Sequence, residues 1–63
     1  MTPREVETVY EALALQLDAI DPKRRDLFLA KLVLLLSHDL GDAERVCLRI
    51  TEAARNIQPY ADD

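Results

Sequence analysis

Apolar residues recur at intervals of three and four positions along three stretches of this chain, and that spacing is typical of one face of an α-helix. No stretch alternates between apolar and polar residues as a half-buried strand does. The prolines and the single glycine fall between these stretches or at their ends. The pattern predicts an all-α fold with three short helices, at about residues 3–19, 22–40 and 43–57.

Cap residues indicate where the first two predicted helices begin. Thr2 precedes Pro3, and Asp21 precedes Pro22. Each proline would occupy the first helical position, where its missing N–H costs no hydrogen bond. Thr2 and Glu5 also have the spacing of a capping box, in which each side chain binds the other residue's backbone N–H. Both helices are therefore expected to begin at their prolines.

Three further residues indicate where the second helix ends and where the third helix begins and ends. Gly41 is typical of a helix C-terminus because glycine readily adopts a positive φ, and Asp42 can cap the next helix. Pro59 is expected to end the last helix. Turns as short as these join helices as antiparallel hairpins. We therefore expect a single helical domain over residues 1–58 and a short tail over residues 59–63.

The second predicted helix is apolar on nearly all sides. Between Leu27 and Leu36 only Lys31 is polar. It forms a narrow stripe with Arg24 and His38 at seven-residue spacing, and this stripe is expected to face water. Such a helix is normally buried, yet two short flanking helices are too few to surround it. We therefore expect it to contact another molecule, together with one leucine from each of the other helices. The predicted interface residues are Leu29, Leu32, Val33, Leu36, Leu40, Leu15 and Leu48.

Chain length and cysteine content also favour association. A chain of 63 residues buries only about 60% of its unfolded surface, and such small domains usually need a disulfide, a metal or a partner. Because Cys47 is the single cysteine, an internal disulfide is excluded. Cys47 and the one histidine, His38, provide only two of the four ligands that a structural zinc site needs. No metal or cofactor is expected. Cys47 and Tyr10 are expected in the core, and the simplest assembly is a six-helix homodimer.

Charge and hydropathy limit the classes of partner. Twelve acidic and eight basic residues give a net charge of −4, which disfavours binding to nucleic acid or to an anionic membrane. The longest apolar run, residues 32–36, is too short to span a bilayer, and the N-terminus lacks the pattern of a signal peptide. A cytoplasmic location is therefore expected. The basic run of residues 23–25 is expected to pair with nearby carboxylates, those of Asp18, Asp21 and Asp26.

One turn gathers the only histidine with two carboxylates. His38, Asp39 and Asp42 could form a polar site with Arg24 and Lys31, and a small ligand-binding or catalytic protein could use the histidine as a proton carrier or metal ligand. The alternative is structural, because a cationic histidine interacts favourably with a helix C-terminus and Asp42 would be only a cap. Since no nucleophile or second ligand has the required spacing, an enzyme is not expected.

A DNA-binding interpretation is also possible. The second and third helices with their short turn could form a helix-turn-helix motif in which Arg45, Arg49 and Asn56 face the DNA. Glu44 and Glu52 interrupt that face, and the net charge is acidic. A minimal DNA-binding regulator is therefore the less favoured hypothesis.

Two segments resemble a known family. Residues 10–13 (Tyr-Glu-Ala-Leu) and residues 34–42 (Leu-Leu-Leu-Ser-His-Asp-Leu-Gly-Asp) are similar to a family of small bacterial proteins classed as a domain of unknown function. The similarity covers about residues 9–42. Its members are stand-alone short chains, some encoded near flavin-dependent oxygenases, so the resemblance implies an accessory or small-subunit role and brings no catalytic residues. The expected function is a non-enzymatic protein–protein interaction module, either an obligate homodimer or a small accessory subunit of a larger protein.

Overall fold

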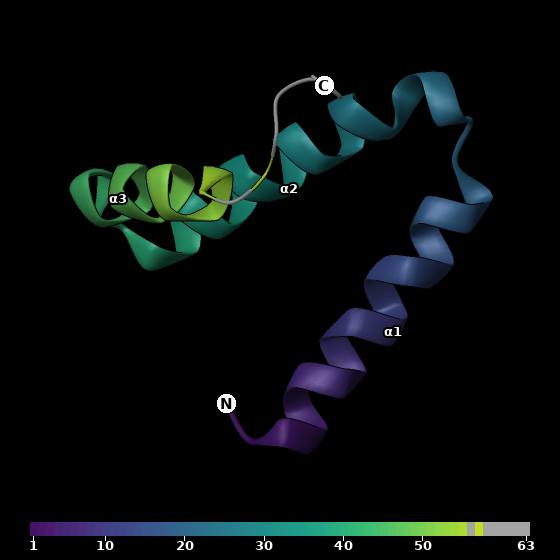
Figure 1. Cartoon of the computed structure of the whole chain (residues 1–63), viewed down its shortest axis with the longest axis horizontal. Helices are drawn as coiled ribbons and strands as arrows, with labels where there is room; N and C mark the ends of the chain where they lie inside the picture. The colour runs from purple at the N-terminus through teal and green to yellow at the C-terminus, as the bar shows by residue number, and fades with distance from the viewer. Residues whose placement is uncertain (56, 58–63) are drawn as a thin grey trace. The chain divides into compact units, whose positions relative to one another are not determined.

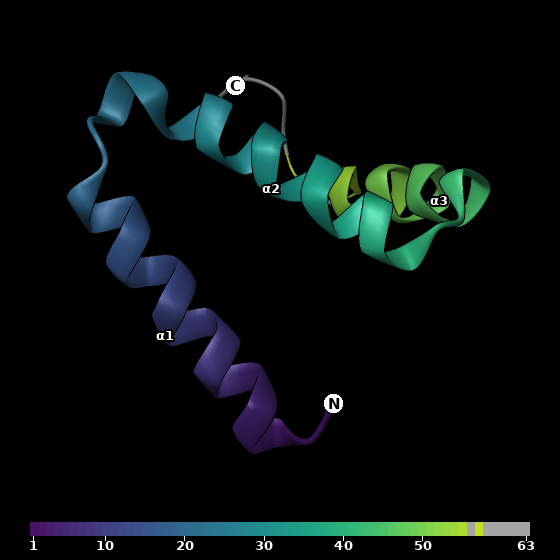
Figure 2. The same ribbon diagram turned by 180° about the vertical axis from the view of Figure 1, so that it is seen from behind.

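The computed structural model describes residues 1–55 and 57, and over these residues the chain consists of helices and turns without a strand. The predicted all-α fold is confirmed. Figures 1 and 2 show the helices from opposite sides. In chain order the elements are α1 (Pro3–Ala19), the 3₁₀ turn η1 (Pro22–Arg24), α2 (Arg25–Leu40) and α3 (Ala43–Ala54).

The start of α1 is a capping box, as the sequence predicts. The backbone N–H of Glu5 donates to Oγ1 of Thr2 over 3.1 Å, and the backbone N–H of Thr2 donates to Oε1 of Glu5 over 2.8 Å. Two backbone donors that have no partner inside the helix are thereby satisfied. The helix begins at Pro3, the predicted residue.

The second helix begins differently from the prediction. A single helix from residue 22 was expected, but the first turn is η1, and the α-helical part starts only at Arg25. The cause is local, because Oδ1 of Asp21 accepts from the backbone N–H of Lys23 over 3.0 Å, and the Asp21 carbonyl accepts from the backbone N–H of Arg24 over 2.8 Å. These short-range bonds tighten the turn to a 3₁₀ geometry, which is frequent at helix N-termini.

The turn between α2 and α3 follows the prediction. Gly41 has a φ of +71°, and its backbone N–H donates to the Ser37 carbonyl over 2.9 Å. This is the simple left-handed C-terminal motif, for which glycine carries no steric penalty. Asp42 then caps α3, since its Oδ1 accepts from the backbone N–H of Arg45 over 3.1 Å.

The third helix is shorter than predicted. It ends at Ala54 rather than near residue 57, because Arg55 takes an extended backbone with ψ of 144° and bonds to the carbonyl of Glu52, three residues earlier. Because Ile57 is exposed, a further helical turn after Ala54 would gain little stability from packing. Helix ends without packing contacts are easily lost. The predicted helix-ending role of Pro59 and the predicted tail over residues 59–63 lie outside the described residues.

The chain forms two compact units, Met1–Leu32 and Val33–Asp63, and the boundary between them falls within α2. They are called unit 1 and unit 2 below and are described separately. Unit 1 holds α1 and the first half of α2, and unit 2 holds the second half of α2 and α3. The prediction of a single domain over residues 1–58 stays a prediction.

Unit 1 is packed only near the junction of its two helices. The half-buried apolar residues of α1 are Leu13, Ala14 and Leu17, and those in the first half of α2 are Phe28 and Leu32. All residues before Leu13 are exposed. The apolar stripe of α1 is therefore covered over its C-terminal half and open over its N-terminal half.

None of the described residues is buried. In unit 2, the half-buried residues are Ser37 and Val46. Tyr10 is 69% exposed and Cys47 is exposed, so the prediction that both lie in the core is wrong for the single chain. The reason is that each helix has few neighbours, and one neighbouring helix covers only part of an apolar face.

Candidate interaction surface

An apolar groove runs along unit 2. Its volume is about 290 Å³, and α2 and α3 supply its walls. Most of the lining is apolar, as in sites that bury another apolar surface. The lining residues of this unit-2 groove are Val33, Leu36, Ser37, Leu40, Val46, Arg49, Ile50 and Ala53.

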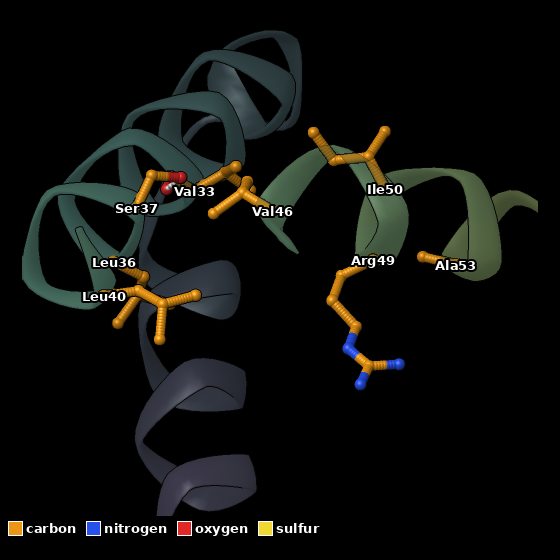
Figure 3. Close-up of a pocket in the computed structure, with 8 residues that line it drawn as sticks. All are labelled: Val33, Leu36, Ser37, Leu40, Val46, Arg49, Ile50 and Ala53. Atoms are coloured by element: carbon orange, nitrogen blue, oxygen red, sulfur yellow. Dashed lines mark hydrogen bonds between the residues drawn. The ribbon is translucent and has the colours of Figure 1, made fainter. Parts of the chain in front are cut away.

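The walls of the unit-2 groove differ in chemistry. Figure 3 shows Leu36 and Leu40 on the α2 wall and Arg49 extending from the α3 wall. The Ser37 hydroxyl donates to the Val33 carbonyl over 2.6 Å, the dashed line in Figure 3. Because this bond stays within α2, Ser37 can line an apolar groove without leaving its hydroxyl unpaired. The groove is thus apolar along its floor with a cation at one edge.

A second groove lies in unit 1. Its volume is about 420 Å³, and it lies between α1 and the first half of α2. The hydroxyl of Thr8, on its edge, donates to the Arg4 carbonyl over 3.0 Å, which again satisfies a polar group within its own helix. The lining residues of this unit-1 groove are Thr8, Val9, Ala12, Leu13, Gln16, Phe28 and Leu32.

Four of the predicted interface residues line these two grooves. Leu32 is half-buried in unit 1, where it faces α1 across the unit-1 groove. Val33, Leu36 and Leu40 line the unit-2 groove and are exposed. These four predicted interface residues are therefore divided between the unit-1 groove and the unit-2 groove.

The remaining predicted interface residues lie outside both grooves. Leu29 is 37% exposed on α2, whereas Leu15 and Leu48 are well exposed on α1 and α3. Leu34 and Leu35 were not among the predicted interface residues, yet both are more exposed than Leu29. The sequence contains no signal that separates these leucines, because a helix that is apolar on all sides does not indicate which sides its neighbours cover.

The polar residues around the His38 turn are accessible. Arg24, Lys31, His38 and Asp39 are exposed, and Asp42 accepts a backbone N–H as the cap of α3. Asp42 therefore acts as a helix cap, as the structural alternative for this turn predicts. Within residues 1–55 and 57, no group of three or more His, Cys, Asp or Glu side chains is placed to hold a metal ion.

The basic run at the start of the second helix makes a different contact from the predicted one. Nε of Arg25 donates to the Leu17 carbonyl over 2.9 Å in a partly buried position. Asp21 accepts a backbone N–H rather than a cationic side chain. The prediction of carboxylate partners is therefore wrong for Arg25. Its side chain instead satisfies one of the last carbonyls of α1. A cation at this end of a helix also interacts favourably with the helix dipole.

Arg49 and Glu52 form an ion pair along α3. Both side chains are largely exposed, so the pair contributes little to stability. The ion pair reduces the positive charge on the side of α3 that would face DNA in a helix-turn-helix motif.

No helix in the described part of the chain is both long and apolar enough to cross a membrane. The resemblance over residues 9–42 to a family of small bacterial proteins stays a prediction. No protein-family model, no curated protein and no solved structure matches this chain.

Proposed function

We propose that this chain is a non-enzymatic protein–protein interaction module that completes its core by association, most simply as a homodimer. One observation carries the proposal: no described residue is buried, while large apolar side chains are exposed on all three helices. Leu34, for example, is 70% exposed. Burying a leucine stabilises by about 1.5–3 kcal/mol, so a partner that covers several of them provides the stability that the single chain lacks.

In the proposed homodimer, α2 lies at the centre of six helices that pack as antiparallel hairpins. Its leucines contact the partner, and the stripe of Arg24, Lys31 and His38 reaches water. A two-fold axis brings the same surface of each chain together, so one apolar surface is enough to close the assembly. Contiguous apolar patches of this kind on small proteins typically mark interaction sites.

A larger protein could occupy the same apolar surface in place of a second copy. The resemblance to stand-alone small bacterial chains supports such an accessory role. A cytoplasmic location belongs to this proposal, because the exposed thiol of Cys47 stays reduced in that compartment.

The molar mass of the purified chain tests the proposal. Light scattering over a dilution series from about 1 to 100 μM should show mass approaching twice that of the 7.2 kDa chain, and the midpoint of thermal unfolding should rise with concentration. A folded monomer across this range, without any partner, would overturn the homodimer. Sub-micromolar binding to duplex DNA at physiological salt would favour the regulator instead.

A further inference from the structure

The two helices of unit 1 are joined by an elbow of two residues, Ile20 and Asp21. Both have extended values of ψ, 139° and 128°, and they connect the end of α1 to η1. A few residues between two elements are the usual place where a change of φ and ψ alters the angle between those elements. The angle between α1 and the first half of α2 therefore depends on the contacts that the helices make on either side of the elbow.

One side-chain hydrogen bond crosses this elbow. Nε of Arg25, the first residue of α2, donates to the Leu17 carbonyl in the last turn of α1 over 2.9 Å, and both residues are half-buried. Within the described part of the chain, every other side-chain hydrogen bond joins residues at most four positions apart. The carbonyls of a helix point along its axis toward the C-terminal end, so the guanidinium reaches Leu17 from beyond the end of α1. The bond therefore ties the start of α2 to the end of α1.

The unit-1 groove is an apolar space between the same two helices. Val9 and Leu13 line it from α1, and Phe28 and Leu32 line it from α2. The volume of the groove is about 420 Å³, and its lining residues are uncharged. Apolar walls gain free energy when they come together and exclude water. A groove of this kind stays open only if a contact keeps its walls apart.

We propose that Arg25 is a latch that sets the angle of the elbow and keeps α1 from closing over the unit-1 groove. A change in this angle moves the Leu17 carbonyl relative to the guanidinium, and a hydrogen bond weakens steeply once its geometry is lost. The half-buried cation would then lack its acceptor, which is unfavourable. The latch thus accounts for the exposure of α1 before Leu13 and leaves that surface to a partner. The inference goes beyond the proposed function, because it concerns the conformation of the single chain.

Distances between two spin labels measure the elbow angle directly. The labels are attached at Glu7→Cys on α1 and Lys31→Cys on α2, both exposed positions, in a chain that carries Cys47→Ser. An excess of the same chain without label sites removes distances between copies from the signal. With Arg25→Met, a population at shorter label-to-label distances should appear, because α1 is then free to close. The matched control Lys23→Met removes the same charge from the preceding turn, and its distance distribution should equal that of the labelled chain without either substitution.

A distribution that Arg25→Met leaves unchanged, or in which it adds only longer distances, would overturn the latch, as would an equal shift in the Lys23→Met chain. Circular dichroism shows whether each variant keeps its helices. If Arg25→Met does not fold, proton exchange in the unaltered chain provides the test. The Nε proton of Arg25 should exchange with water roughly tenfold more slowly than that of the exposed Arg24, because it is hydrogen-bonded. Equal exchange rates would refute the latch.

Discussion

Replacing Leu36 by alanine should weaken association of the homodimer without disturbing α2. Leu36 is 57% exposed in the single chain, so just over half of its surface is available for burial by a partner. Full burial of a leucine is worth about 1.5–3 kcal/mol, and the substitution removes most of the side chain. With two copies in the dimer, the loss is about 1–3 kcal/mol of association free energy. The dissociation constant should therefore rise roughly 5- to 150-fold.

Sedimentation equilibrium over a concentration series measures this change directly. Alanine has at least the helix propensity of leucine, so circular dichroism of the variant should retain the helical signal at concentrations where the unaltered chain is associated. Lys31→Ala provides the matched control on the same helix. Lys31 is exposed and belongs to the stripe expected to face water, so its removal should change the dissociation constant by no more than about twofold.

The opposite result would refute the reasoning. If the Leu36→Ala chain associates as tightly as the unaltered chain, Leu36 remains in water in the assembly and the unit-2 groove is not part of the contact. If Lys31→Ala weakens association as much as Leu36→Ala does, the polar stripe rather than the apolar surface contacts the partner.

Three further substitutions test the local contacts, with stability measured by urea or thermal unfolding at one protein concentration. Arg25→Met removes the hydrogen bond to the Leu17 carbonyl and should lower the free energy of unfolding by about 1–2 kcal/mol, which lowers Tm by roughly 4–16 °C. An unchanged Tm would contradict the role assigned to Arg25. Asp42→Ala removes the cap on the backbone N–H of Arg45 and should cost about 1 kcal/mol. Gly41→Ala should cost about 1–2 kcal/mol for its positive φ alone, since a Cβ would meet nothing within 4 Å, and Gly41→Asn should cost less.

The helix limits were largely predictable because the groups that set them are neighbours in sequence. Thr2 and Glu5 cap α1, Gly41 ends α2, and Asp42 caps α3, in each case through bonds that span no more than four residues. Such bonds form wherever the residue types occur at the right spacing. The end of α3 was less predictable, because no glycine or proline lies between Ala54 and Pro59 to mark it. Packing then decides where the helix end is lost.

The contact of Arg25 could not be read from the sequence. Its partner is a backbone carbonyl, that of Leu17, which every residue possesses and which no side-chain pattern marks. The nearby carboxylates of Asp18, Asp21 and Asp26 offered more obvious partners for a cation. Only the packing of α1 against the first half of α2 brings the guanidinium to that carbonyl.

The sequence alone determined that this chain is helical, both limits of α1, the end of α2 and the start of α3. It also determined that α2 has more apolar surface than two neighbours can cover. Those conclusions follow from periodicity and local capping. The tertiary structure decided which leucines line each groove and which stay open. Leu32 is half-buried against α1, whereas Leu34 and Leu35 are exposed. The physical reason is that a helix apolar on every side has no preferred face, so only its neighbours select the surface that remains for a partner.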